Sequence, residues 1–315
     1  MNPLSAIYGS VTKIRNRLYD RGTLRSQRLS RPVISVGNIS AGGSGKTPFV
    51  ILLGDLLKQR GIRFDVLSRG YGRDTHGVLV VDPSGNPRQF GDEPILISQR
   101  LGCPVIVGES RYEAGTFAEK TFNSGFHLLD DAFQHRSLAR NFDIVLFTSQ
   151  DLNDDLLPAG RLREPVSSLG RADAIVLSED VDAKYLPSGK LIWRVKRTLS
   201  IPQHVQSNSP FVFCGIARPQ SFLDQLRAAG IQVAGHKFYR DHHRYSERDI
   251  TKLLALRDFH NADGFITTQK DLINLGPLYA RLAPICFPPV NIELTEPADA
   301  LDTMLRVIAD RRSQP

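Results

Sequence analysis

The sequence has few of the residues that build disulfide frameworks or zinc sites. Its 315 residues include three cysteines, Cys103, Cys214 and Cys286, and no Cys-x-x-Cys pair. An odd number of widely spaced cysteines argues against a disulfide scaffold and a cysteine-based metal site, and it is typical of a reducing compartment. We therefore expect the three thiols to pack in the core rather than to act as nucleophiles.

Long hydrophobic runs are also missing. No run of about 18 apolar residues occurs, so we expect no membrane-spanning helix, and the N-terminal residues lack the apolar stretch of a secretory signal. Hydrophobic residues make up 41% of the chain and charged residues 23%, which is typical of a soluble globular protein. The length is sufficient for two domains with buried cores.

Acidic residues are scarce near the N-terminus. Within residues 1–31 the only acid is Asp20, so this segment carries six of the seven net positive charges of the chain. Its basic residues are Lys13, Arg15, Arg17, Arg21, Arg25, Arg28 and Arg31. Its apolar residues recur at helical spacing and are Leu4, Ile7, Tyr8, Val11, Ile14 and Leu18.

A basic amphipathic helix of this kind can lie on an anionic membrane. Composition alone leaves a second interpretation equally open, namely a solvated basic helix that docks on the protein itself. A nucleic-acid-binding arm is less favoured, because the segment has a clean apolar face and no basic domain follows it.

A glycine-rich segment lies between two apolar runs, 33–36 and 49–53, which predicts a strand, a loop and a helix. Backbone amides of such a loop surround phosphate oxygens, and the helix N-terminus adds a partial positive charge. The usual pattern is G-x-x-x-x-G-K-[ST], and Ser40 replaces its first glycine here. We predict that Lys46 contacts the β- and γ-phosphates and that Thr47 binds Mg²⁺. The predicted nucleotide-binding residues are Ser40, Ala41, Gly42, Gly43, Ser44, Gly45, Lys46 and Thr47.

Apolar runs alternate with helical patterns along the chain, which predicts an α/β fold with a mainly parallel sheet. A turn-rich passage, 200–210, separates a second α/β unit. The expected strands are 33–36, 64–67, 105–107, 126–129, 144–147, 174–177, 211–214, 232–233 and 265–267. The expected helices are 47–60, 111–122, 220–229, 247–257 and 297–311.

Acidic and basic residues follow several of these strands. Asp130 and Asp131 end an apolar strand, as the Mg²⁺-binding acids of phosphoryl-transfer enzymes do, although a solvated strand-end turn is the alternative. Arg69, Tyr71 and Arg73 form a turn suited to an anionic or sugar-phosphate ligand. Asp92 precedes a helix, where a role as N-cap explains it equally well.

These segments together resemble the tetraacyldisaccharide 4′-kinase family, the lipid A 4′-kinases of Gram-negative bacteria. The resemblance extends in order from about residue 33 to residue 272, and Ser40 fits it, because this family commonly has Ser or Thr there. The matching residues are Val36-Gly37-Asn38, 41–48, 68–72, 91–94, Asp130-Asp131 with Gln134-His135, 157–160 with Arg163-Glu164, Gly215-Ile216 with Pro219, Asp241-His242, and Thr268 with Lys270-Asp271.

The resemblance implies transfer of the γ-phosphate of ATP, with Mg²⁺, to the 4′-hydroxyl of tetraacyldisaccharide 1-phosphate in lipid A biosynthesis. It implies two α/β/α sandwich domains, the first a P-loop NTPase-like mainly parallel sheet, joined by a short β linker, with an amphipathic N-terminal helix at the cytoplasmic face of the bacterial inner membrane. We place the segments at 1–31, 32–190, 191–209 and 210–315. We expect no nucleic acid and no obligate protein partner.

The resemblance also implies site residues. It places Asp92, His242 and Lys46 in catalysis, and Thr47, Asp130, Asp131 and Glu164 at the metal. The sequence does not decide whether Asp92 or His242 accepts the hydroxyl proton, and the role of His243 stays open.

Three positions depart from the family pattern. Ala132-Phe133 stands where Gly-Leu is common, Arg161 where Pro is common, and Gln269 where Glu is usual. None of them removes a residue assigned to chemistry.

A membrane-associated P-loop switch ATPase is the alternative function. Switch ATPases of the partitioning type carry a lysine just before Gly-Gly-x-Gly-Lys, and Ala41 stands there instead.

Overall fold

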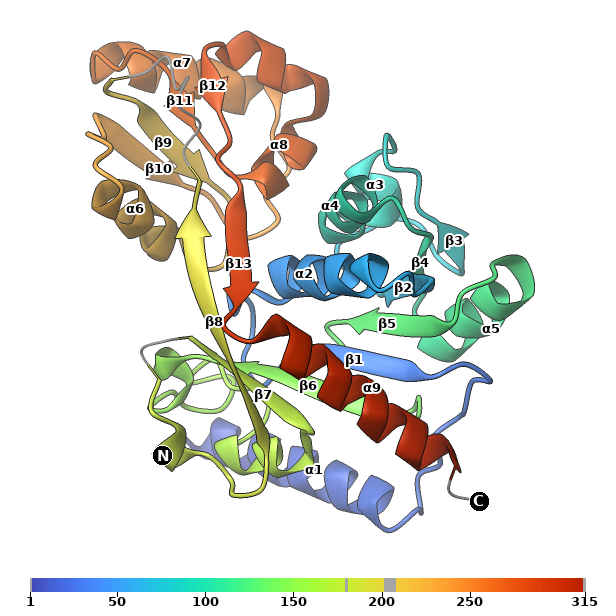
Figure 1. Ribbon diagram of the computed structural model, residues 1–315. Coiled ribbons are helices and arrows are strands. Elements are labelled where there is room, and N and C mark those ends of the chain that lie inside the picture. Colours follow the sequence, from blue (N-terminus) through green and yellow to red (C-terminus); the bar gives the residue numbers. More distant parts are fainter. Residues whose placement is uncertain (1, 179–180, 201–207, 314–315) are drawn as a thin grey trace.

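A computed structural model of the protein describes residues 2–178, 181–200 and 208–313. An N-terminal helix lies below a large sheet domain, and two strands lead from the large sheet to a smaller domain (Figure 1). No helix among the described residues is both long and apolar enough to span a membrane.

The large sheet has nine strands. Only its two edge pairs, β3 with β4 and β13 with β8, are antiparallel, and all other neighbours are parallel. In spatial order the strands are β13 (Val290–Leu294), β8 (Leu191–Leu199), β7 (Ala174–Ser178), β6 (Phe142–Phe147), β1 (Val33–Asn38), β5 (Phe126–Asp130), β2 (Phe64–Ser68), β4 (Val105–Val107) and β3 (Leu79–Val80).

Helices cover both faces of this sheet. One face packs against α2 (Lys46–Gln59), α4 (Asp92–Leu101) and α9 (Pro297–Ser313), with Phe49, Ile97 and Met304 fully buried there. The other face packs against α5 (Arg111–Thr121) and a 3₁₀ segment, η2 (Val166–Arg171). The central strand β1 is buried at all six positions, as expected of a parallel strand covered on both sides.

The smaller domain repeats this three-layer arrangement around a four-stranded parallel sheet. Its strands in spatial order are β10 (Gly235–Phe238), β9 (Phe211–Cys214), β11 (Phe265–Ile266) and β12 (Ile285–Cys286). One face packs on α6 (Pro219–Ala228), and the other packs on α7 (Glu247–Phe259), α8 (Gln269–Leu275) and η4 (Gly276–Leu282). The predicted α/β fold is confirmed.

The predicted C-terminal domain of 210–315 needs a correction. β13 pairs with β8 over Val290–Leu294, and α9 inserts Leu301 and Ile308 into the core of the large sheet. These last two elements therefore belong to the large domain. β8 and β13 are the two strands that run between the domains (Figure 1), and residues 201–207 of the predicted linker lie outside the described residues.

The predicted strand at 232–233 is wrong, because the strand beside β9 starts at Gly235.

All three thiols are free; Cys214 is buried and the other two are partly buried. Burial raises the pKa of Cys103 to about 12, so this thiol is protonated at neutral pH, as expected of a packing residue.

The remaining described elements are short or lie at the surface. They are α1 (Pro3–Asp20), α3 (Pro87–Phe90), η1 (Ser149–Asp151) and η3 (Ala183–Tyr185).

Candidate active site

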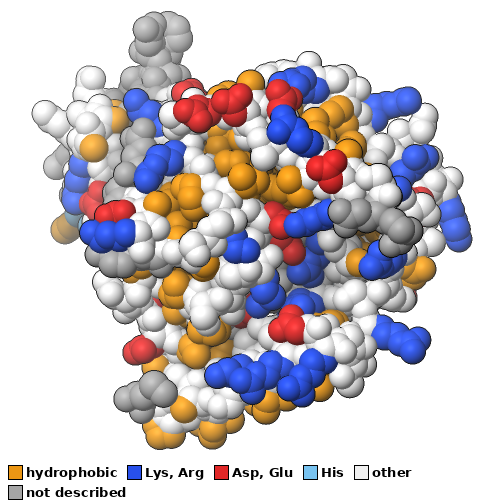
Figure 2. All heavy atoms as spheres, turned by 60° about the horizontal axis from the view of Figure 1, so that its bottom comes forward, with side chains coloured by type: hydrophobic (Ala, Val, Ile, Leu, Met, Phe, Trp, Pro, Cys, Tyr) orange, Lys and Arg blue, Asp and Glu red, His pale blue; other side chains and the backbone are white. Residues whose placement is uncertain are grey.

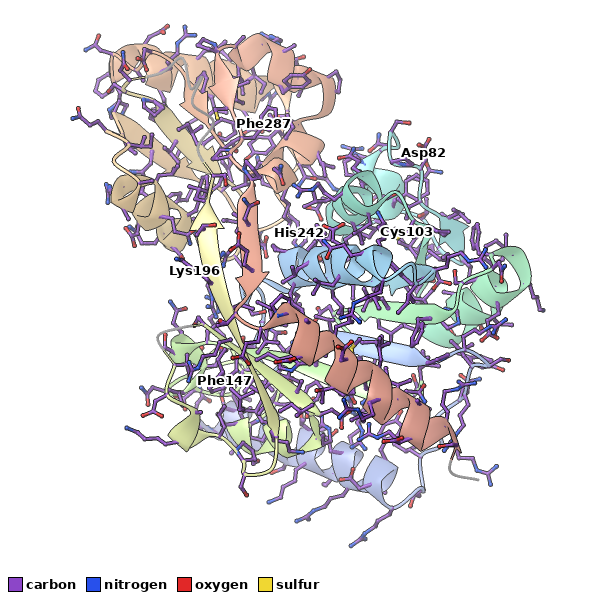
Figure 3. All side chains as sticks on the ribbon, viewed as in Figure 1. Asp82, Cys103, Phe147, Lys196, His242 and Phe287 are labelled. Atoms are coloured by element: carbon purple, nitrogen blue, oxygen red, sulfur yellow. The ribbon has the colours of Figure 1, made fainter. Side chains whose placement is uncertain are left out.

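The carboxyl ends of strands from both sheets open onto one cleft of about 1130 Å³. The large domain contributes residues 41–49 after β1 and Asp131 after β5. The small domain contributes the segments after β9, β10 and β11, which carry Arg218, His242 and Lys270. His242 lies beside α2 and α4, where the two domains face each other (Figure 3). Ligands of parallel α/β sheets bind at such carboxyl ends.

Residues 40–47, called the phosphate loop from here on, have the backbone that anion binding needs. Gly42, Gly43 and Gly45 have φ angles of 69°, 70° and 87°, which glycine adopts without strain. Within the part of the chain that the structure describes, the amides of residues 42–45 donate no hydrogen bond to the protein. These amides are therefore available to a ligand, at the N-terminus of α2.

Lys46 and Asp131 face each other beside this loop. Their Nζ and Oδ1 atoms are 3.6 Å apart. Arg163 donates two hydrogen bonds, of 2.7 and 3.1 Å, to the same carboxylate. Burial alone would raise the pKa of Asp131, but Lys46 and Arg163 outweigh burial and hold that pKa well below its usual range. Asp131 is therefore a carboxylate at neutral pH.

Asp130 has the opposite environment. Its side chain is buried, Oδ2 lies 3.4 Å from the Ser68 hydroxyl, and Oδ1 has no hydrogen-bond partner among the described residues. Burial, with the nearby Glu93 and Asp131 charges, raises the pKa of Asp130 to about 7. A buried carboxylate oxygen without a partner costs free energy, so this position suits a carboxylate that meets a cation from the cleft.

Asp92 and His242 form a pair across the domain interface. His242 Nδ1 lies 2.9 and 3.0 Å from the two oxygens of Asp92. Asp92 is 4% exposed and also accepts hydrogen bonds from the Asn274 amide at 2.8 Å and the Glu93 backbone amide at 2.8 Å. Its carboxylate is therefore fully engaged, whereas the ring of His242 lines the cleft.

The second ring nitrogen of His242, Nε2, also has a contact with the protein. Lys270 Nζ lies 3.2 Å from His242 Nε2 and 3.1 Å from Asp241 Oδ1. Because an ammonium group only donates hydrogen bonds, this contact requires a lone pair on Nε2 and hence the proton on Nδ1, facing Asp92. Burial and the Lys270 charge lower the pKa of His242, but the Asp92 bond and the charges of Asp92 and Glu93 together outweigh them, and the pKa is raised.

A search for relatives identifies the group to which these features belong. The family model described as tetraacyldisaccharide-1-P 4′-kinase matches residues 1–309. The chain belongs to this family. A tetraacyldisaccharide 4′-kinase of Koribacter versatilis is 47% identical over 99% of this chain and all of the relative. That of Aquifex aeolicus is 38% identical over 87% of this chain and 88% of its own.

A solved structure agrees with the sequence relatives. The crystal structure of LpxK from Aquifex aeolicus in complex with ATP superposes with a TM-score of 0.79 at 34% identity, covering 97% of both chains. The family fold therefore extends over both domains of the present chain.

Most of the predicted site residues lie together. The phosphate loop from Ala41 to Thr47, Asp131, Tyr71 and His242 line the same cleft. Ser40 is buried and accepts a bond from Asn38 at 3.2 Å, so its side chain supports the loop from inside. Asp92 lies behind His242, and Asp130 immediately precedes Asp131 in the chain.

Two predicted residues are engaged elsewhere. Glu164, expected at the metal, is fully buried, and its oxygens accept bonds from Arg171 at 2.7 and 3.1 Å, Asn16 at 2.6 Å and Gln134 at 3.2 Å. Arg73, expected at the substrate, bonds to Glu109 and the Gly77 carbonyl with its side chain only 3% exposed. In this arrangement both side chains stabilise loops instead of facing the cleft.

The structure adds three residues to the site that the sequence did not indicate. Arg163 holds Asp131, Lys270 contacts His242, and Asn274 holds Asp92. Arg163 and Lys270 lie within motifs that were recognised, so their charge beside an acidic motif was an available signal. Asn274 had none, because it meets Asp92 across 182 positions of sequence.

Proposed function

We propose that this protein transfers the γ-phosphate of ATP to the 4′-hydroxyl of tetraacyldisaccharide 1-phosphate. One observation carries the proposal: a phosphate loop from one domain and His242 from the other line a single cleft, and Asp92 bonds to His242 from behind. Phosphoryl transfer needs a phosphate site and a group that accepts the proton of the attacking hydroxyl. The family relationship and the relatives' printed names identify the substrate class.

The geometry favours His242 as the group that accepts the proton. Asp92 fills its hydrogen-bonding capacity with His242, Asn274 and the Glu93 amide. The Nε2 lone pair of His242 lies next to the cleft and accepts a hydrogen bond from Lys270, which must give way to the substrate hydroxyl. Asp92 then fixes the tautomer and stabilises the imidazolium that forms. A base with a pKa near neutrality is the most effective at neutral pH.

The residues present fit a Mg²⁺–nucleotide complex. Asp131, ionised at neutral pH, and the Thr47 hydroxyl line the cleft, and Asp130 has a buried oxygen without a partner. The described residues contain no group of three His, Cys, Asp or Glu that could hold a metal, and protein-bound Mg²⁺ commonly uses one or two carboxylates plus substrate phosphates. When bound, Mg²⁺ neutralises developing phosphate charge.

The acceptor is assigned to the side of the cleft formed by the 68–73 turn. Tyr71 is 65% exposed, and its ring centroid lies 5.1 Å from that of His242. Arg69 is exposed in the same turn and remains our candidate for the 1-phosphate of the acceptor. Arg73 is no longer a candidate, because Glu109 and Gly77 hold it.

Helix α1 supports a role at the inner-membrane surface. It docks on the protein through polar groups: Tyr8 Oη donates to the Arg163 carbonyl at 3.0 Å, and Asn16 donates to Glu164. Its apolar side chains instead face outward and are between 57% and 61% exposed; they are Leu4, Ile7, Val11 and Ile14. Hydrophobic and basic side chains gather on the lower part of the molecular face drawn in Figure 2, in which the bottom of Figure 1 comes forward. An outward apolar stripe flanked by Lys and Arg fits the interface of an anionic membrane.

The deciding experiment mixes purified protein, γ-labelled ATP, Mg²⁺ and tetraacyldisaccharide 1-phosphate in detergent. We expect label to appear in the lipid. No transfer to lipid, together with ATP hydrolysis that a protein partner stimulates, would replace this proposal with a switch ATPase.

A further inference from the structure

Arg218 belongs to the small domain but lies against the phosphate loop of the large one. It immediately precedes α6, in the segment after β9. A Cβ atom built on Gly43 would lie 2.5 Å from Arg218 Cγ and 2.9 Å from its Nε. Its neighbour Ala217 similarly approaches Gly42. The tip of this segment therefore covers the loop whose free amides face the cleft.

The guanidinium of Arg218 has little compensation from the protein. Its side chain is 13% exposed; Nη1 donates to Thr148 Oγ1 at 3.2 Å, and Nη2 lies 3.6 Å from Asp151 Oδ1. Nε is buried and has no partner among the described residues. Asp151 uses its other oxygen to cap η1 through the Thr148 amide and hydroxyl, at 2.8 and 2.9 Å.

Other cations surround the same place. Arg161 donates to the carbonyl of Ala41 at 2.9 Å, and Arg197 of β8 lines the cleft near Gly45. Burial lowers the pKa of Arg218, and the Arg161 charge acts in the same direction, against the opposing effect of Asp151 and Asp154. With Lys46, four cationic side chains lie around amides that have no partner among the described residues. Asp131 and Asp151 offset part of this charge, and the set of donors that remains suits an anionic ligand with several oxygens.

We propose that Arg218 binds the polyphosphate chain of the nucleotide, so that the phosphates are held by the loop of one domain and by an arginine of the other. A planar guanidinium can donate two parallel hydrogen bonds to phosphate oxygens. The same arrangement of the two domains places His242 against Asp92. This inference rests on the proposed ATP-dependent function.

The test measures nucleotide binding by calorimetry, without turnover. The full-length variants are Arg218→Gln and Arg218→Lys, with Arg227→Gln as the matched control, because Arg227 lies on α6, is 54% exposed and makes only a distant 3.9 Å pair with Asp224. For Arg218→Gln we expect the affinity for ATP and ADP to fall about 10- to 100-fold, the range for hydrogen bonds to a charged group. Arg218→Lys should regain part of this loss, and Arg227→Gln should bind as the wild type does.

Adenosine, measured by competition, separates phosphate binding from a general disturbance of the cleft. Its affinity should be the same in all four proteins. If Arg218→Gln binds ATP within twofold of the wild type, or loses ATP, ADP and adenosine equally, the inference is overturned. If Arg218→Gln does not fold, Arg218→Lys decides. Unchanged ATP affinity in this variant would contradict the proposed pair of hydrogen bonds from the guanidinium to the phosphates.

A substitution of Thr148, which accepts a hydrogen bond from Arg218, tests whether Arg218 has only a structural role. If Arg218 serves only to bind Thr148, then Thr148→Val should weaken ATP binding as much as Arg218→Gln does. We expect a smaller loss. Failure of the proposed function has a different signature, because the wild-type protein would then transfer no label to the lipid even where it binds ATP.

Discussion

At the residue scale, Asp92 of the large domain and His242 of the small domain form one hydrogen-bonded pair. Asp92 is buried at the start of α4 and takes three hydrogen bonds, while His242 reaches it from the small domain with φ of 57°. A positive φ is uncommon for a residue other than glycine. The strain is consistent with a backbone held in place to aim the imidazole at Asp92.

Removing either member of this pair should affect turnover more than nucleotide binding. For His242→Gln and Asp92→Asn we expect kcat to fall by about 10²- to 10⁴-fold, the range for general acid–base catalysis. The affinity for ATP should change little, because neither side chain belongs to the phosphate loop. His76→Gln is the control, since His76 is 92% exposed. A collapse of ATP binding in Asp92→Asn would instead assign Asp92 to the metal.

His127 gives a second prediction at this scale, on stability. It is fully buried in β5 and bonds to Asp65 at 2.7 Å and Glu119 at 3.3 Å. Burial alone would lower its pKa, but these two carboxylates raise it above 6.5. A raised folded pKa means that this stabilisation is complete below pH 6.5 and is lost as the pH rises through the folded value.

We therefore expect the denaturation midpoint of the wild type to fall between pH 6.5 and 9 more steeply than that of His127→Gln. Urea unfolding at several pH values measures the difference, which cancels the titration of other groups. Glu119→Gln leaves one carboxylate on His127 and should show an intermediate slope. Equal slopes in all three proteins would mean that His127 does not titrate in this range.

Much of the site was predictable at this scale because its residues belong to short local patterns. A phosphate loop needs only consecutive residues, so residues 40–47 were recognised directly. A strand-end acidic pattern indicated Asp131, and the resemblance to the family indicated the Asp92–His242 pair. It could not show that Arg73 and Glu164 are held by Glu109 and Arg171, because those ion pairs depend on how loops pack.

At the element scale, the structure shows how α1 lies on the rest of the protein. The helix does dock on the protein, but through polar groups such as Ser5 and Tyr8. Its apolar side turns outward, which is the reverse of an ordinary surface helix. Removing residues 1–31 would also remove Asn16 from Glu164 and would disturb the segment that carries Arg163.

Substitutions on the outward stripe are therefore a better test of membrane binding than deletion. For the combined replacement of Leu4, Ile7, Val11 and Ile14 by Ser, we expect at least a tenfold loss of binding to vesicles containing anionic lipid, because burying each large apolar side chain contributes about 1.5–3 kcal/mol. Cosedimentation measures the bound fraction. Kinase activity on detergent-dispersed acceptor should persist, because the stripe does not line the cleft.

The control for this experiment is Phe259→Ser, which removes an exposed apolar side chain, 79% exposed, from the small domain. It should bind vesicles as the wild type does. Undiminished binding of the stripe variant would show that α1 is not the membrane-contacting element.

The elements also show where sequence patterns stop being informative. Apolar runs predicted β1, β5 and β6 because buried parallel strands are continuously hydrophobic. β13 alternates polar and apolar residues and gains its strand conformation by pairing with β8, about 95 residues earlier in the chain. That pairing is why the end of the chain was assigned to the wrong domain.

At the scale of the whole molecule, several side-chain contacts join the two domains, among them Asn274 with Asp92, Lys270 with Glu93 and Arg218 with Thr148. Beyond the Asp92–His242 pair, Arg244 of the small domain reaches Asp74 at 2.7 and 3.2 Å and also the Gly72 carbonyl. Both side chains are about half exposed, at 44% and 54%. Exposed ion pairs add little to stability. We therefore expect this pair to position the small domain next to Tyr71 and the acceptor side of the cleft.

Reversing the Arg244 charge should loosen the closed arrangement without unfolding either domain. For Arg244→Glu we expect kcat to fall by a factor of about two to five, the effect typical of losing an exposed pair, with the melting temperature unchanged. The double variant Asp74→Arg/Arg244→Glu restores opposite charges across the rim and should recover part of the activity. Dyes placed on α5 and α7 would report the distance between domains, which should increase in Arg244→Glu and return in the double variant. If the single variant keeps full kcat and the wild-type distance, closure depends on the nucleotide side of the cleft, where Arg218 meets the phosphate loop.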